Sequence, residues 1–211
     1  VCIENTHNRG GGNIQPYEVV AAICRWAAEH GLRRHLDGAR LWNAAVATGI
    51  PPGRWAEHFD TVSVCFSKGL GAPVGSALAG PKDLIDEALR HRKVLGGGMR
   101  QAGVLAAAAL YALDHHIDRL AEDHANAQRL AEGVANTPGL KLAWDSFPTN
   151  LVFFTVDAGR GTAAQLAARL QEQGVLVLAD GPQTIRMATH LDISAADVET
   201  ALAVLEQALR K

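Results

Sequence analysis

Cysteine is scarce in this 211-residue chain, and acidic and basic residues nearly cancel. The three cysteines, Cys2, Cys24 and Cys65, are odd in number and widely spaced, which argues against a disulfide framework and a cysteine-based zinc site. With 20 Lys and Arg against 22 Asp and Glu, the net charge is -2. The sequence therefore lacks the basic excess typical of proteins that bind nucleic acids or anionic membranes. We expect neither kind of partner.

Long apolar runs are missing as well. No stretch approaches the roughly 18 consecutive apolar residues that a membrane-spanning helix needs. Residues 1–12 show neither the basic start nor the apolar core of a signal peptide. Because 48% of the residues are hydrophobic and only 20% are charged, the chain is expected to bury a sizeable core. The sequence predicts a globular protein of the cytoplasm.

Helical and strand patterns alternate along the chain, which favours an α/β fold with a mainly parallel sheet and flanking helices. Thr162 and Ser194 are expected helix N-caps, the latter in a capping box with Asp197. We predict a large domain over residues 1–136 and a smaller C-terminal α/β domain over residues 137–211. The expected helices are 17–30, 41–48, 81–95, 101–113, 117–134, 162–173 and 195–209, and the expected strands are 32–36, 61–66, 76–79, 140–143, 151–156, 175–178 and 184–188.

Lys68 differs from the other four lysines in its surroundings. It follows the strand expected at 61–66 and precedes a loop of small residues, Gly69 to Gly75. In open α/β sheets the ligand crevice lies beyond the carboxyl ends of the strands. A lysine partly desolvated there can form a Schiff base with a carbonyl compound. The alternative is an ordinary surface lysine in a loop.

Asp37 is expected to end the preceding strand, 31 residues before Lys68. Two strand ends carrying Asp and Lys about one β-helix-β unit apart can face the same crevice. Pyridoxal 5'-phosphate (PLP) needs a carboxylate that keeps its pyridine nitrogen protonated, since the cationic ring is the electron sink. The alternative for Asp37 is an N-cap of the helix that follows.

Arg186 lies on the strand expected at 184–188, with Ile185 and Met187 pointing to the opposite face. Its guanidinium can therefore leave the apolar face and bind a carboxylate in a cleft between the domains. The alternative is an exposed surface arginine. The nine histidines show no His-x-x-x-His pattern, so no metal site is expected.

Four strings together resemble the low-specificity L-threonine aldolase family, which is grouped with β-eliminating lyases and has the aspartate-aminotransferase-like fold (fold type I). The Ser-Lys-Gly-Leu-Gly-Ala-Pro-Val-Gly string is highly specific, and the Thr-Ile-Arg-Met-Ala-Thr-His string near the C-terminus is supportive. The four strings are Glu4 to Asn8, His35 to Asn43, Cys65 to Ser76 and Gly96 to Gln101.

The resemblance implies a PLP-dependent lyase that cleaves the Cα–Cβ bond of L-threonine or L-allo-threonine, giving glycine and an aldehyde. Lys68 would form the Schiff base with PLP and Asp37 would pair with the ring nitrogen. The carboxylate of the small β-hydroxy amino acid would be held by Arg40 and Arg186. It further implies that Lys93 and Arg100 lie near the cofactor phosphate, within the chain or across a subunit interface, and that Asn8 contacts the ring face or its 3-hydroxyl.

Family members carry, upstream of the Glu4 to Asn8 string, a phosphate-binding loop and a histidine that stacks on the cofactor. This sequence begins at Val1, within an expected strand, and contains neither. We therefore expect that a missing N-terminal segment or a separate chain supplies them, and that these 211 residues alone bind PLP poorly and are inactive.

The family also implies a homodimer or homotetramer, because fold type I sites are commonly completed by a neighbouring subunit. The remaining alternatives are a PLP-dependent β-eliminating lyase or aminotransferase, and a non-catalytic α/β module in which Lys68 is only a loop residue.

Overall fold

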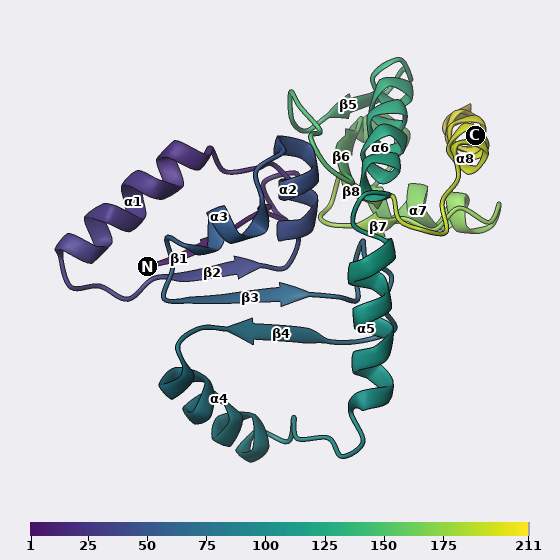
Figure 1. Ribbon diagram of the computed structural model, residues 1–211. Coiled ribbons are helices and arrows are strands. Elements are labelled where there is room, and N and C mark those ends of the chain that lie inside the picture. Colours follow the sequence, from purple (N-terminus) through teal and green to yellow (C-terminus); the bar gives the residue numbers. More distant parts are fainter. Residues whose placement is uncertain (211) are drawn as a thin grey trace. The chain divides into compact units, whose positions relative to one another are not determined.

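The computed structural model describes residues 1–210 and contains two compact units (Figure 1). Unit 1 comprises Val1–His7 and Ile14–Leu120. Unit 2 comprises Asn8–Asn13 and the described chain from Ala121 onward. The domain boundary expected near residue 136 stays a prediction.

Unit 1 is built on a four-stranded sheet in the order β1-β2-β3-β4. The pairings β1–β2 and β2–β3 are parallel, whereas β4 runs antiparallel to β3. The carboxyl ends of β1, β2 and β3 therefore meet at one edge of the sheet, as the α/β prediction required. The strands are β1 (Cys2–Glu4), β2 (His35–Gly38), β3 (Thr61–Cys65) and β4 (Ser76–Ala79).

The helices of unit 1 contribute to two apolar clusters. The first joins α1 (Tyr17–Glu29), α2 (Leu41–Thr48) and the short α3 (Pro52–Ala56) to the strands, with Trp55 fully buried. The second lies under the loop that follows β3 and contains Leu70, Ala72, Ala112 and Leu120. Two further helices are α4 (Lys82–Val94), with no buried residue, and α5 (Gly103–His115).

Unit 2 holds an antiparallel sheet in the order β5-β6-β8-β7. Its core is the largest apolar cluster of the described chain and includes three alternate residues of β6, Val152, Phe154 and Val156. The elements are α6 (Leu120–Ala135), whose first residue belongs to unit 1, β5 (Leu140–Leu142), β6 (Leu151–Val156), a 3-10 turn (Ala158–Arg160), α7 (Ala163–Gln171), β7 (Leu178–Ala179), β8 (Thr184–Ala188) and α8 (Ala195–Arg210).

Two expected strands begin too early, and the reason is the same in both. Leu32 and Val175 each follow a glycine at a helix end, and their amides donate to Ala27 and Leu170 carbonyls of the preceding helix. The intervening Gly31 and Gly174 have φ of +67° and +82°. Each apolar residue therefore completes a helix C-cap rather than starting a strand. The strand predictions 32–36 and 175–178 were wrong at their amino ends.

The starts of two helices were predicted correctly from their capping residues. The Thr162 side chain accepts from the Gln165 amide, and Gln165 in turn accepts from the Thr162 amide, which is a capping box. Ser194 and Asp197 make the same reciprocal pair at the start of α8. Both predicted N-caps are confirmed.

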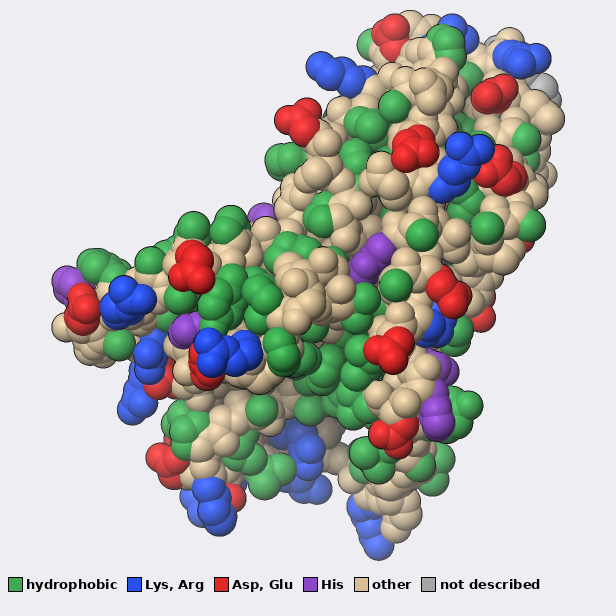
Figure 2. Space-filling view, turned by 45° about the horizontal axis from the view of Figure 1, so that its top comes forward, with side chains coloured by type: hydrophobic (Ala, Val, Ile, Leu, Met, Phe, Trp, Pro, Cys, Tyr) green, Lys and Arg blue, Asp and Glu red, His purple; other side chains and the backbone are tan. Residues whose placement is uncertain are grey.

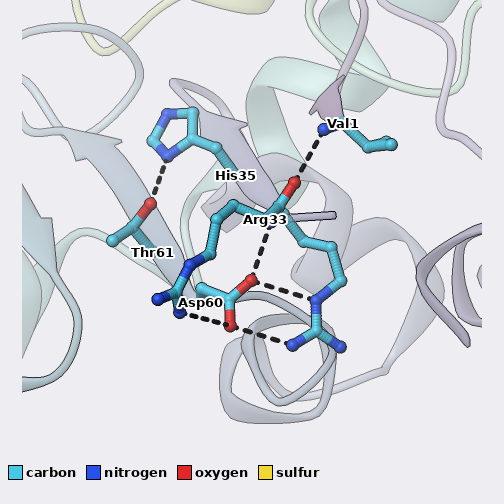
Figure 3. A network of polar contacts seen from close by, with 6 residues as sticks. Val1, Arg33, His35, Asp60 and Thr61 are labelled. Atoms are coloured by element: carbon cyan, nitrogen blue, oxygen red, sulfur yellow. Dashed lines mark hydrogen bonds and ion pairs between the residues drawn. The ribbon is translucent and has the colours of Figure 1, made fainter. Parts of the chain in front are cut away.

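A polar network ties the amino ends of β2 and β3 together (Figure 3). Asp60 accepts hydrogen bonds from the Arg34 backbone amide at 2.7 Å and from the Arg34 guanidinium at 2.9 and 3.0 Å. These bonds lower the pKa of Asp60 to about 2. The His35 ring also contacts the Thr61 hydroxyl, at 2.9 Å. Within residues 1–210, no helix is long and apolar enough to cross a membrane.

Candidate active site at the carboxyl edge of the unit 1 sheet

Asp37 lies within β2, between two strands. It is opposite Glu4 of β1 on one side and Ser63 of β3 on the other. Its backbone carbonyl accepts from the Asn5 amide at 3.0 Å, and its carboxylate accepts from the Ala39 amide at 3.1 Å. The N-cap of α2 is Arg40 rather than Asp37. The Asp37 carboxylate oxygen accepts a hydrogen bond within the turn before α2, and Asp37 is not the residue that caps this helix. The alternative of a helix N-cap is therefore wrong.

The residues that follow Asp37 explain why its motif needs a glycine. A Cβ on Gly38 would lie 2.8 Å from the Ser63 carbonyl oxygen and 3.1 Å from the Leu41 Cβ. The turn therefore brings β3 and the start of α2 close to β2, and it places Arg40 directly before α2, at its N-cap. Arg40 is only 7% exposed, in contrast to most arginines.

Lys68 lies three residues beyond the end of β3, in a loop whose backbone is stabilised by its own hydrogen bonds. The Phe66 carbonyl accepts from Ala72 and the Lys68 carbonyl accepts from Gly71, at 3.0 and 2.8 Å. Gly71 has a φ of +71°, a conformation that suits glycine. Leu70 is 1% exposed, whereas Lys68 itself is exposed. The buried loop residues thus fix the backbone while the lysine side chain remains accessible.

Asp37 lies in β2 and Lys68 follows the neighbouring β3, so both belong to the carboxyl edge of the same sheet. An open cavity of about 490 Å³ reaches Asp37 and is also lined by Glu4, His7 and Gln15. His7 Nε2 lies 3.6 Å from the Glu4 carboxylate. The Asp37 carboxylate and the His7 imidazole of this cavity can take part in proton transfer, and Lys68, which does not line the cavity, offers a nucleophilic amine at the same edge of the sheet.

Two buried polar residues at this edge had no predicted role. Asn5 and Thr6 are 0% and 1% exposed, and they follow β1 directly. The Asn5 side-chain oxygen accepts from Gln15, but neither Asn5 Nδ2 nor Thr6 Oγ1 has a hydrogen-bond partner within residues 1–210. Unsatisfied buried polar groups are uncommon and often mark a ligand site. Their position directly after the first strand was the sequence signal that could have identified them as site residues.

The path of the chain after β4 leads to Lys93 and Arg100. β4 leads the chain back toward the amino ends of the strands, and α4 begins there, with Leu84 beside Arg34 and Asp60 around one cavity. Within residues 1–210, neither Lys93 nor Arg100 has a hydrogen bond or ion pair to Asp37 or Lys68, and both are exposed. Their assignment to the cofactor phosphate stays a prediction.

Arg186 and Asn8 belong to unit 2. Ile185 and Met187 are 0% and 8% exposed, whereas Arg186 faces away from them and is partly exposed, as the strand alternation predicted. The Arg186 Nε atom is buried and has no hydrogen-bond partner among the described residues. Asn8 is partly buried, and its carbonyl accepts from the Gly11 amide.

The fold is shared with solved enzyme structures. A putative L-allo-threonine aldolase of Listeria monocytogenes superimposes with a TM-score of 0.81 at 24% identity, covering 98% of this chain and 60% of that one. The architecture is therefore that of the fold type I group, as expected from the sequence.

Sequence comparison gives the family. The model of the beta-eliminating lyase family matches residues 1–159, and the chain belongs to this family. It is 41% identical over 210 residues to low-specificity L-threonine aldolase 1 of Arabidopsis thaliana, covering 99% of this chain and 59% of that protein. It is 42% identical over 192 residues to the low specificity L-threonine aldolase of Escherichia coli K12, covering 91% and 55%. The chain thus spans somewhat more than half the length of these relatives.

Proposed function

We propose that the protein containing this chain is a PLP-dependent aldehyde-lyase that converts L-threonine or L-allo-threonine to glycine and acetaldehyde. The observation that carries the proposal is the placement of Asp37 and Lys68 at the carboxyl edge of one sheet, in a chain more than 40% identical to proteins named threonine aldolases. In this reaction the Cα–Cβ bond breaks, the β-hydroxyl loses its proton to become the aldehyde, and Cα gains a proton.

The residues present fit PLP. Lys68 offers an accessible primary amine for the cofactor's aldehyde carbon, and Asp37 has a second carboxylate oxygen that can hold the proton of the pyridine nitrogen. Bound PLP would supply an electron sink for the pair left on Cα. Asn8, Lys93 and Arg100 are the proposed contacts to the ring and the phosphate.

Arg40 and Arg186 are the proposed ligands of the substrate carboxylate. A guanidinium presents two parallel donors, which match the two oxygens of a carboxylate. The unpartnered Arg186 Nε supports this role, because a buried donor without a partner is costly unless a ligand satisfies it. By fixing the carboxylate near the ring plane, the arginines would leave the Cα–Cβ bond upright, which selects it for cleavage.

The experiment compares the products of L-threonine, L-allo-threonine and L-serine for the full-length protein with added PLP. Aldol cleavage yields glycine and an aldehyde, whereas β-elimination yields a 2-oxo acid and ammonia. The proposal predicts glycine as the main product and its loss in Lys68→Ala. Release of 2-oxo acid alone would instead support the β-eliminating lyase, to which the family name points.

A non-catalytic module predicts a different outcome. In that case PLP would not bind. Lys68→Ala would then change neither product release nor the visible absorbance of the protein mixed with PLP. Arg186 would then bind no substrate, and its role would be confined to the structure of unit 2.

A further inference from the structure

We propose that His116, at the end of α5, is a positioning residue that holds the lysine loop, here defined as Phe66 to Gly75. The inference rests on the proposed function, because it assigns to the loop the task of presenting Lys68. It concerns a histidine that lies 48 residues from Lys68 in sequence.

The contact itself is short and tertiary. His116 Nδ1 lies 2.6 Å from the Leu70 carbonyl oxygen, a contact that spans 46 residues of chain. Because a carbonyl only accepts, Nδ1 must carry the proton and donate. Leu70 is 1% exposed, and its carbonyl therefore has little access to water as a substitute partner.

One peptide group connects this contact to Lys68. The Leu70 carbonyl and the Gly71 amide belong to the same planar unit, and the Gly71 amide donates to the Lys68 carbonyl at 2.8 Å. His116 therefore holds one end of a rigid plane whose other end binds the backbone of Lys68. Rotation of that plane would break both hydrogen bonds together.

His116 is itself well anchored. Its backbone amide donates to the Ala112 carbonyl, and its ring meets Tyr111 edge-on with 5.5 Å between the ring centres. Ala112 and Leu70 belong to the same apolar cluster, so α5 and the lysine loop also make apolar contacts beside the hydrogen bond. Such packing makes the contact a fixed feature of unit 1.

The loop has little freedom on its other side. A Cβ on Gly69 would lie 2.6 Å from Leu120 Cδ2 and 3.5 Å from the Asn43 side-chain oxygen. Gly69 is thus closely packed between α2 and the start of α6, while the Leu70 carbonyl binds His116 at the end of α5. Three helices thereby surround the backbone that carries the exposed Lys68 amine.

The test uses the full-length protein with PLP and two variants that differ in the donor. His116→Leu removes the donor, whereas His116→Asn keeps an amide donor near the position of Nδ1. His115→Leu is the matched control, since His115 is adjacent and exposed, and its ring also contacts Tyr111, with 4.3 Å between the ring centres. The first readout is amide hydrogen exchange at Gly71, which does not depend on catalysis.

We expect His116→Leu to speed exchange at Gly71 by about tenfold or more relative to the control. It should also slow borohydride trapping of PLP on Lys68 and lower kcat for glycine release by about tenfold with little change in KM, because the lysine is displaced while substrate binding is kept. His116→Asn should restore most of each effect.

Exchange and kcat in His116→Leu that match His115→Leu would overturn the inference. If His116→Leu does not fold, His116→Asn and His116→Gln decide, because glutamine places its amide farther from the backbone; equal Gly71 exchange in the two contradicts the proposal. If the parent neither traps PLP nor releases glycine, the proposed function fails, while the exchange result still tests how His116 holds the loop.

Discussion

Each residue proposed for the site has a local structural role that can be separated from its chemical role. Asp37 illustrates this, since one carboxylate oxygen accepts from the Ala39 amide. Asparagine keeps that acceptor but removes the negative charge. We expect Asp37→Asn to fold with near-parent stability and to lower kcat for glycine release by tenfold or more, which is about 1.4 kcal/mol. Parent-like kcat, measured at saturating threonine and PLP, would remove Asp37 from the site.

Arg186 gives a second prediction at this scale. Replacement by lysine keeps the charge but loses the planar pair of donors. Arg186→Lys should therefore lower kcat/KM for L-threonine by tenfold or more, about 1.4 kcal/mol. Arg129→Lys is the control, because Arg129 of the same unit forms an exposed ion pair with Glu199. Steady-state kinetics measure both, and equal values for the two variants would count against a carboxylate clamp.

At the scale of elements, the Arg34–Asp60 pair connects the amino ends of β2 and β3, away from the proposed site. Since the pKa of Asp60 is lowered from 3.8 to about 2, its ionised form stabilises the fold above pH 3.8. That contribution is lost as the pH falls toward 2. Asp60→Asn should lower the free energy of unfolding by about 1–2 kcal/mol at neutral pH, with partial exposure of the pair limiting the effect.

Denaturant unfolding at pH 7 and at pH 2.5 measures this effect. The difference between parent and Asp60→Asn should shrink at the lower pH. Asp118→Asn serves as the control, because Asp118 is exposed on a turn. A gap that stays constant between the two pH values would contradict the role assigned to the Asp60 charge.

Sequence patterns predicted the elements well where side chains determine them locally. The hydroxyl of Thr162 and the β-branched run at 61–65 are such local signals, and both were interpreted correctly. Leu32 and Val175 were misassigned because an apolar residue after a glycine suits a helix C-cap as well as a strand. The α3 helix was missed because Pro51 and Pro52 suggest a break, although proline at the first helical turn is compatible with a helix.

The sequence predicted only part of the proposed site, because some of its contacts join segments that are far apart in the chain. Asp37 lies near the end of β2 and Lys68 follows the end of β3, so their shared edge could be inferred from topology. The contact between His116 and Leu70 could not, since it joins segments 46 residues apart and His116 belongs to none of the motifs. The same limit applies to Asn5 and Thr6, whose burial depends on packing around them.

For the whole molecule, the exposed apolar side chains of unit 1 lead to a prediction of self-association. Figure 2 shows groups of hydrophobic side chains on the visible surface with charged residues between them. Val94 and Leu95 are 83% and 84% exposed at the end of α4, and Val104 is 76% exposed on α5. Large apolar side chains that are this exposed often belong to an interface with another chain. We expect a homodimer or homotetramer with two-fold symmetry.

Sedimentation velocity at micromolar concentration tests this expectation. Leu95→Glu should shift the protein toward monomer, because it places a charge in the interface. Leu176→Glu is the control, since Leu176 is 78% exposed but lies in unit 2. A parent that sediments as a monomer, or equal shifts in both variants, would contradict this interface. The cytoplasmic location predicted from the sequence is tested separately by cell fractionation.

The central claim is that Lys68 is the residue that holds PLP, and peptide mapping after borohydride reduction tests it most directly. The full-length protein is incubated with PLP, reduced, digested and analysed by mass spectrometry. We expect one pyridoxyl group per chain, on the peptide that contains Lys68, and its absence in Lys68→Ala. A pyridoxyl group on Lys82, Lys93 or Lys141 in place of Lys68, or no stoichiometric labelling, would contradict it.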